Sequence, residues 1–203
     1  TVPFGPVVGI VNAERVGTDI TPYWAPDRKV FKEAPTVPNV CRNLINRCYM
    51  NHRLFFSDPD THIARIDNNK LTENEVILWT RAIWLTGGLL LLSDRFETLD
   101  PERTKYPKLL IQEQDQFHTR PLDLFDREYP AVWYGVHKKT GQKVVGLFNF
   151  ENEERVLSIP LDEISRGTTF RISDLSSGED LGSAEKQFEA AVPAHSCRIF
   201  ELK

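Results

Sequence analysis

Long apolar runs and cysteines are both scarce in this 203-residue chain. The longest apolar run, residues 89–92, is far shorter than the roughly 18 residues that a membrane-spanning helix needs, so the sequence predicts no membrane span. Three cysteines are too few for a disulfide framework. Cys41 and Cys48 fall in one predicted helix, where they would lie about 10 Å apart, too far to bridge. No C-x-x-C or His/Cys cluster indicates a zinc site.

A strong excess of charge is also missing. The chain has 25 Lys and Arg residues and 29 Asp and Glu residues, which gives a net charge of −4. The basic residues are scattered along the chain, so a nucleic-acid-binding groove is not expected. A hydrophobic content of 40% is typical of a globular protein, and the length allows one large domain or two small ones.

Residues 1–115 have patterns in which strands and helices alternate. Thr72 and Glu75 are spaced as in a capping box, and Gly87 with Gly88 ends the helix that follows. This order predicts a parallel α/β sheet. It is either a small open sheet or the last part of a (β/α)₈ barrel, since a complete barrel needs about 250 residues. The expected strands are residues 7–12, 54–57 and 89–92, and the expected helices are residues 37–50 and the segment after Thr72.

From residue 116 onward the pattern predicts only strands. Six short apolar segments are separated by turn residues, which is typical of a small antiparallel sandwich. The sequence therefore predicts two domains, residues 1–115 and residues 116–203. The expected strands of the second domain are residues 131–137, 143–150, 155–161, 168–174, 186–192 and 198–202.

Acidic residues follow each of the three strands expected in the first domain. Arg15 and Asp19 come after the first strand, Asp58 and Asp60 after the second, and Asp94 after the third. Parallel α/β folds place their chemistry at the carboxyl ends of strands. Each acid taken alone is also explained as a turn former or a helix cap. Together they indicate a site that holds hydroxyl groups or transfers protons.

Residues 9–24 have the pattern G-x-V-x-x-x-R-x-x-x-D-x-x-P-x-W. This pattern resembles a motif of family 36 α-galactosidases, whose R-x-x-x-D core is shared with family 27. Residues 56–60 are similar to the family's N-D-P-D strand, and residues 71–75 and 87–94 resemble the helix and final barrel strand that follow it. The resemblance implies a fold of mixed class, α/β plus all-β: the last strands of a (β/α)₈ TIM barrel, then a C-terminal antiparallel β-sandwich.

The resemblance also implies a retaining glycosidase that cleaves terminal α-galactosyl residues. Asp19 would be the general acid/base, because a departing alkoxide needs a proton near neutral pH. The planar fork of Arg15 would hold a sugar hydroxyl and the adjacent carboxylate. Asp60, with Asp58 beside it, would bind hydroxyls of the terminal sugar. The resemblance calls for no metal and no organic cofactor.

The sequence departs from the family in ways that limit these expectations. The family's nucleophile lies in a K-x-D motif on an earlier strand, and no K-x-D occurs here. We therefore expect an N-terminal barrel segment to supply the nucleophile and the remaining strands, and the isolated chain to be inactive. Ser57 stands where the family has Asn, and Thr61 where it has an apolar residue, so the sugar and linkage stay open.

Alternative functions and partners follow from the same residues. The chain could belong to a related α-glycan hydrolase or transglycosylase of the same clan. It could instead be a non-catalytic module, whose sandwich packs or binds glycan and whose α/β part is a scaffold. The expected partners are an α-galactoside oligosaccharide or glycoconjugate and the missing barrel segment, with an oligomer possible. Nucleic acid and membrane are not expected as partners, and the sequence does not fix the compartment.

Overall fold

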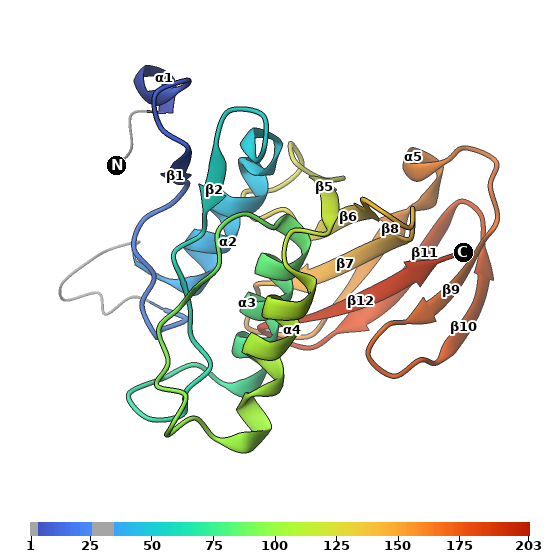
Figure 1. The fold of residues 1–203 in the computed structure, drawn as a ribbon. Coiled ribbons are helices and arrows are strands. Elements are labelled where there is room, and N and C mark those ends of the chain that lie inside the picture. The colour runs from blue at the N-terminus through green and yellow to red at the C-terminus, as the bar shows by residue number, and fades with distance from the viewer. Residues whose placement is uncertain (1–3, 26–34) are drawn as a thin grey trace. The chain divides into compact units, whose positions relative to one another are not determined.

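Helices and strands alternate in the first part of the chain, and strands dominate the second part (Figure 1). The computed structural model describes residues 4–25 and 35–203. The chain divides into two units, Thr1–Gln116 and Phe117–Lys203, and each is described by itself. Within the described ranges, no helix is both long enough and apolar enough to cross a bilayer.

The strands of the first unit are short and pair in parallel. Strand β1 (Ala13–Arg15) pairs with β2 (Phe56–Asp58), and β3 (Thr61–His62) pairs with β4 (Leu91–Leu92). Residues 59 and 60 lie between β2 and β3 and are not part of either strand. The middle segment thus pairs with one neighbour through its first half and with another neighbour through its second half, as expected for three consecutive parallel strands.

Three helices of this unit lie side by side next to the strands (Figure 1). Helix α3 begins with the predicted capping box, in which Thr72 and Glu75 bond each other's backbone amides, and it ends at Gly87. Helix α2 begins at an N-cap formed by the side chain of Thr36. Among the described residues of the unit, the helical elements are α1 (Phe4–Val7), α2 (Val37–Asn46), η1 (Cys48–Met50), α3 (Glu73–Thr86), η2 (Pro101–Arg103) and α4 (Lys105–Glu113).

The strand face of this unit carries exposed apolar side chains. Phe56 is 44% exposed and Leu91 is 41% exposed, although both are strand residues. The next residue of β2, Ser57, is only 2% exposed, because successive strand residues point to opposite faces. One face of the strands is therefore buried, and the other leaves large apolar groups in contact with solvent.

The strand predicted at residues 7–12 is wrong. Part of that segment is the end of α1, and Gly9 then takes a left-handed conformation with φ of 79° that breaks an extended chain. The strand begins only at Ala13, which pairs with Phe56. The residues just before Phe56 form a turn and offer no strand partner, so apolar composition alone could not make residues 7–12 a strand.

The strands predicted at residues 54–57 and 89–92 are also shifted or shortened. Strand β2 starts two residues later than expected, and only Leu91 and Leu92 form β4. The amide of Leu89 instead donates to the carbonyl of Ser57, 2.8 Å away. Leu91 is exposed, so this strand is not covered on both of its faces.

The second unit is built from two antiparallel sheets. Six strands are ordered β10-β9-β12-β7-β6-β5, and β11 pairs with β8 in the other sheet. The bounds are β5 (Phe117–Pro121), β6 (Val132–His137), β7 (Lys143–Asn149), β8 (Arg155–Pro160), β9 (Phe170–Asp174), β10 (Asp180–Ala184), β11 (Gln187–Val192) and β12 (Ser196–Leu202), with the short helix α5 (Leu161–Ile164) after β8. All six predicted strands of this unit are present. β5 and β10 were not predicted, because their sequences are largely polar and carry a weak apolar pattern.

The core of this unit lies between its two sheets. Alternate residues of the larger sheet meet alternate residues of the β8–β11 pair, the period-two packing of a sandwich. The members with the lowest exposure come from both sheets and include Val145, Leu147, Ile159, Ile172 and Val192. The sandwich therefore encloses a continuous apolar core of its own.

Candidate active site

Four polar side chains meet at the carboxyl ends of β1 and β2. Arg15 is the last residue of β1, and the strand register sets it opposite Asp58, the last residue of β2. Asp19 follows Arg15 by four residues, and Asp60 follows Asp58 by two. We call these four residues the Arg15 cluster. The sequence predicted all four as site residues, and the structure brings them together.

One guanidinium group contacts all three carboxylates of the cluster. The Nε atom of Arg15 lies 2.9 Å from Oδ2 of Asp58, and its Nη1 lies 2.9 Å from Oδ2 of Asp60. The same Nη1 lies 3.2 Å from Oδ1 of Asp19. Burial alone would lower the pKa of Arg15, but the hydrogen bond and charge of Asp58, with the charges of Asp60 and Asp19, raise it above its ordinary value. Arg15 is therefore a fixed cation within the cluster.

Backbone amides hold Asp60 in position. Its Oδ2 accepts a 2.7 Å hydrogen bond from the amide of Ile20, and its Oδ1 accepts one of 2.8 Å from the amide of Thr61. Its own amide donates to Oδ1 of Asp58 at 2.8 Å. Asp60 has a φ of 74°, a left-handed conformation that is uncommon for residues other than glycine. The residue is thus fixed at both its backbone and its carboxylate.

The three carboxylates differ in their contact with solvent. The side chains of Asp58 and Asp60 are 15% and 12% exposed, whereas that of Asp19 is 86% exposed. Asp58 and Asp60 are therefore preorganised acceptors, and Asp19 is the accessible carboxyl group of the cluster. A site with three carboxylates around one guanidinium can accept hydrogen bonds from hydroxyl groups and can exchange a proton at Asp19.

Helix α2 positions the loop that carries Asp19, and sequence reasoning missed this support. Asn39 donates to Oγ1 of Thr18 at 3.2 Å, and Arg47 donates to the carbonyl of Val16 at 2.8 Å. A side chain on Gly17 would meet Asn43 at 3.4 Å, so the loop passes close to the helix. The signal in the sequence was a row of polar residues, Asn39, Asn43 and Arg47, spaced four apart on one helix face.

Asp94, the third acid expected at a strand end, does not join the cluster. Its side chain is 2% exposed, accepts from the amide of Ala64 at 2.7 Å and pairs with Nη1 of Arg65 at 3.2 Å. It therefore ties two loops together. In the part of the chain that the structure describes, no group of three or more His, Cys, Asp or Glu side chains is arranged to hold a metal ion.

Three features together define the fold class of this chain. They are parallel strands with adjacent helices, acids at the carboxyl ends of those strands, and a sandwich that follows them. The chain has the last strands of a (β/α)₈ barrel followed by a C-terminal antiparallel β-sandwich. Residues 128–202 match the family of the alpha galactosidase C-terminal beta sandwich domain. The chain is 25% identical to "Probable alpha-galactosidase B" of Aspergillus oryzae over 92% of its length, and 26% identical to the protein of that name from Penicillium simplicissimum over 95%.

Solved structures give the same fold. A family 27 β-L-arabinopyranosidase of Geobacillus stearothermophilus matches with a TM-score of 0.73 and 16% identity, covering 98% of this chain and 46% of that one. Alpha-galactosidase I of Mortierella vinacea matches with a TM-score of 0.73 and 14% identity, covering 98% of this chain and 55% of that one. The chain is thus similar to the C-terminal part of α-galactosidases. The family named among these structures is 27, so the family 36 assignment is not confirmed.

The chain spans under half the length of the curated relatives, covering 44% of the Aspergillus protein and 45% of the Penicillium protein. More than half of each of these relatives therefore has no counterpart in this sequence. Any activity that depends on that remainder belongs to a longer protein.

Proposed function

We propose that this chain supplies the acid/base half of a retaining glycosidase site that cleaves terminal α-galactosyl residues. Residues 1–115 would be the C-terminal part of a barrel catalytic domain, and residues 116–203 the sandwich domain. The observation that carries the proposal is the Arg15 cluster, in which one arginine at a strand end contacts three carboxylates. Residues 9–24 support family 36 within the clan that it shares with family 27.

Each member of the cluster has a chemical role in this proposal. Asp19 protonates the departing oxygen in the first step and takes a proton from water in the second. Its high exposure in this chain leaves room for a leaving group and for water. Asp60 and Asp58 accept hydrogen bonds from hydroxyls of the terminal sugar, and Arg15 holds these carboxylates in place.

The nucleophile would come from an N-terminal barrel segment. Retaining glycosidases form a covalent intermediate on a second carboxylate about 5–5.5 Å from the acid/base. The exposure of Phe56 and Leu91 supports such a segment, because residues on the inner face of a closed barrel are covered by the other strands. The substrate would be an α-galactoside oligosaccharide or glycoconjugate.

A β-L-arabinopyranoside is a second candidate substrate. A matched structure belongs to a β-L-arabinopyranosidase with a TM-score of 0.73, equal to that of the matched α-galactosidase. The sugars differ in the exocyclic group of the ring. Thr61, which replaces an apolar residue after Asp60, lies next to the carboxylate that would bind the sugar.

The proposal is tested by assaying the natural longer protein that carries this segment. Aryl α-galactosides and aryl β-L-arabinopyranosides are compared at equal concentration, with the isolated 203-residue chain assayed in parallel. We expect the longer protein to hydrolyse one of them with retention of configuration, and the isolated chain to show no turnover because it lacks a nucleophile. Turnover by the purified isolated chain, or no glycosidase activity in the longer protein, would contradict the proposal.

A further inference from the structure

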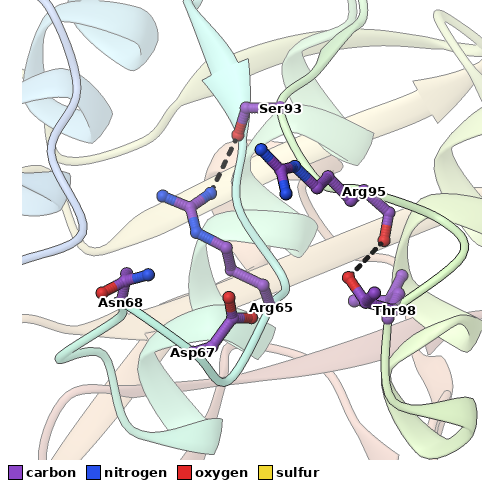
Figure 2. A pocket seen from close by; sticks show the side chains of 7 residues that line it. Arg65, Asp67, Asn68, Ser93, Arg95 and Thr98 are labelled. Carbon is purple, nitrogen blue, oxygen red and sulfur yellow. Dashed lines mark hydrogen bonds between the residues drawn. The ribbon is translucent and has the colours of Figure 1, made fainter.

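A polar hollow lies beyond the carboxyl ends of β3 and β4 (Figure 2). Its volume is about 400 Å³. Two arginines, Arg65 and Arg95, line it together with hydroxyl and amide groups, one carboxylate and one leucine. None of the residues of the Arg15 cluster lines this hollow, so it is a separate site on the first unit. The remaining lining residues are Asp67, Asn68, Ser93, Thr98 and Leu99.

Hydrogen bonds between two loops hold Arg65 in place. The buried carboxylate of Asp94 accepts from the amide of Ala64 at 2.7 Å and from Nη1 of Arg65 at 3.2 Å. The same Nη1 lies 3.3 Å from Oγ of Ser93, and Ser93 donates to the carbonyl of His62 at 3.1 Å. The loops after β3 and β4 are therefore tied together at the base of the hollow. The Nε and Nη2 groups of Arg65 have no hydrogen-bond partner among the described residues.

Arg95 brings a second guanidinium group to the same hollow. Figure 2 shows the hydrogen bond between Arg65 and Ser93, and Arg95 lines the same hollow. Asp94 neutralises Arg65 from its inner side, whereas Arg95 has no carboxylate within ion-pair distance in the described part of the chain. Asp67 contributes a carboxylate to the lining but forms no ion pair with either arginine there. The hollow thus holds more unpaired donors than acceptors.

We propose that this hollow binds an oxyanion, a carboxylate or sulfate carried by the leaving-group side of the substrate. Guanidinium groups present paired donors that match the oxygens of such anions, and hydrogen bonds to charged groups are the strong ones. An anion between the two arginines would also reduce their mutual repulsion. Ser93, Asn68 and Thr98 would add neutral hydrogen-bonding groups around it.

The position of the hollow fits a site for a sugar beyond the terminal one, which rests on the proposed function. Arg65 follows Asp60 by five residues, so their Cα atoms lie at most about 18 Å apart. Both the hollow and the Arg15 cluster lie at carboxyl ends of parallel strands in one unit. An oligosaccharide with its terminal galactosyl group at Asp60 can extend over this distance.

The test measures binding without turnover, by calorimetry on the natural longer protein. Methyl glucuronide carries a carboxylate, methyl glucoside is its neutral counterpart, and inorganic sulfate is an oxyanion without a sugar. We expect the glucuronide to bind at least about tenfold more tightly than the glucoside, and sulfate to compete with it. Failure of both the glucuronide and sulfate to bind would overturn the proposal. Binding of sulfate alone would overturn the assignment to the leaving group.

Three variants separate a specific site from a general effect of charge. Arg95→Gln should weaken glucuronide binding about tenfold, because it removes an unpaired guanidinium. Arg166→Gln, at an exposed position of the second unit, removes the same charge elsewhere and should leave the affinity unchanged. Asp67→Asn should tighten binding, since it removes a carboxylate that repels the anion. Equal effects of Arg95→Gln and Arg166→Gln, or weaker binding in Asp67→Asn, would overturn the proposal.

These outcomes are distinguishable from failure of the proposed function. Hydrolysis of a neutral aryl α-galactoside by the wild-type protein is measured beside the binding assays. Hydrolysis without glucuronide binding overturns only the oxyanion site. Glucuronide binding that depends on Arg95, in a protein without glycosidase activity, overturns only the proposed function and the link to a leaving group.

Discussion

At the scale of single residues, the Arg15 cluster shows what spacing along a chain can predict. Arg15 and Asp58 were predicted to belong to one site because both follow strands of a parallel sheet, and the strand register in the structure pairs them directly. Asp94 also follows a strand, but its carboxylate accepts hydrogen bonds from the amide of Ala64 and from Arg65. Strand-end position thus predicts where an acid lies. It does not predict whether a backbone amide of a neighbouring loop already donates a hydrogen bond to its carboxylate.

His62 is buried as a neutral side chain in β3. Its Nε2 lies 2.9 Å from Oγ1 of Thr80, which itself donates to the carbonyl of Val76 at 2.7 Å, so Nε2 is the donor. Its Nδ1 has no partner, and a second proton there would be left without an acceptor. Burial lowers the pKa of His62 from 6.5 to about 4, and the charge of Asp94 opposes this only in part.

This pKa predicts a loss of stability on acidification. The unfolded chain binds a proton at His62 below about pH 6.5, whereas the folded chain does so only near pH 4. The free energy of unfolding is therefore unaffected by His62 above pH 6.5, and it falls by up to about 3 kcal/mol as the pH drops to 4. Urea unfolding of the natural longer protein at several pH values measures it. In His62→Gln this part of the pH dependence should disappear.

The matched control for that experiment is His118→Gln, at an exposed position of β5. Its pH dependence should follow the wild type between pH 4 and 6.5. A His62→Gln variant that loses stability with the same slope as the wild type would show that His62 does not carry the effect.

At the scale of elements, helices were predicted better than barrel strands. The capping box at Thr72 and the stop at Gly87 are local signals, and both are confirmed. The bounds of β1 and β4 depend on which residues of the neighbouring strand are available for pairing. The sequences of residues 7–12 and 89–92 carry no information about that neighbour. In the second unit the apolar alternation located six strands, because each has a face in the core. The hollow at Arg65 and Arg95 was not predicted, since two loops form it.

The connection from α3 to β4 requires glycine at position 88. Gly88 has a φ of 97°, and a Cβ there would lie 2.2 Å from the carbonyl oxygen of Ser57. That oxygen already accepts from the amide of Leu89, so it cannot move without loss of the bond. We expect Gly88→Ala to destabilise the protein by at least about 2–4 kcal/mol, measured by urea unfolding.

Gly141→Ala is the control for this prediction. Gly141 has a φ of 72° but no atom within 4 Å of an added Cβ, so only the backbone conformation is strained. Its cost should stay near about 1–2 kcal/mol. Equal losses in the two variants would mean that the approach of Ser57 to Gly88 adds nothing.

At the scale of the whole molecule, both units bury apolar side chains, but they differ in how their strands are covered. The sandwich, Phe117–Lys203, has buried residues from both of its sheets in one cluster. In the first unit, Phe56 and Leu91 leave a strand face exposed. Large exposed apolar groups on strands are covered in a complete fold. We therefore expect the two segments to behave differently when they are separated.

We expect the segment 116–203 to fold alone with a modest stability of about 5 kcal/mol, and residues 1–110 not to. The two segments are expressed separately and followed by calorimetry and sedimentation. The sandwich segment should melt cooperatively as a monomer, whereas residues 1–110 should aggregate or lack a cooperative transition. If residues 1–110 are instead monomeric, soluble and melt cooperatively, the partial barrel is wrong and a small open α/β sheet replaces it.

The central claim is that Asp19 serves as the acid/base of a retaining site. It is tested most directly by kinetics of Asp19→Asn in the natural longer protein, with and without azide. On an α-galactoside with a poor leaving group, we expect the rate to fall about 10²–10⁴-fold, because an amide cannot transfer a proton. An activated leaving group should restore the first step, and azide should restore the second and yield α-galactosyl azide, since azide needs no general base. A near wild-type rate on the poor leaving group, without azide, would contradict the account.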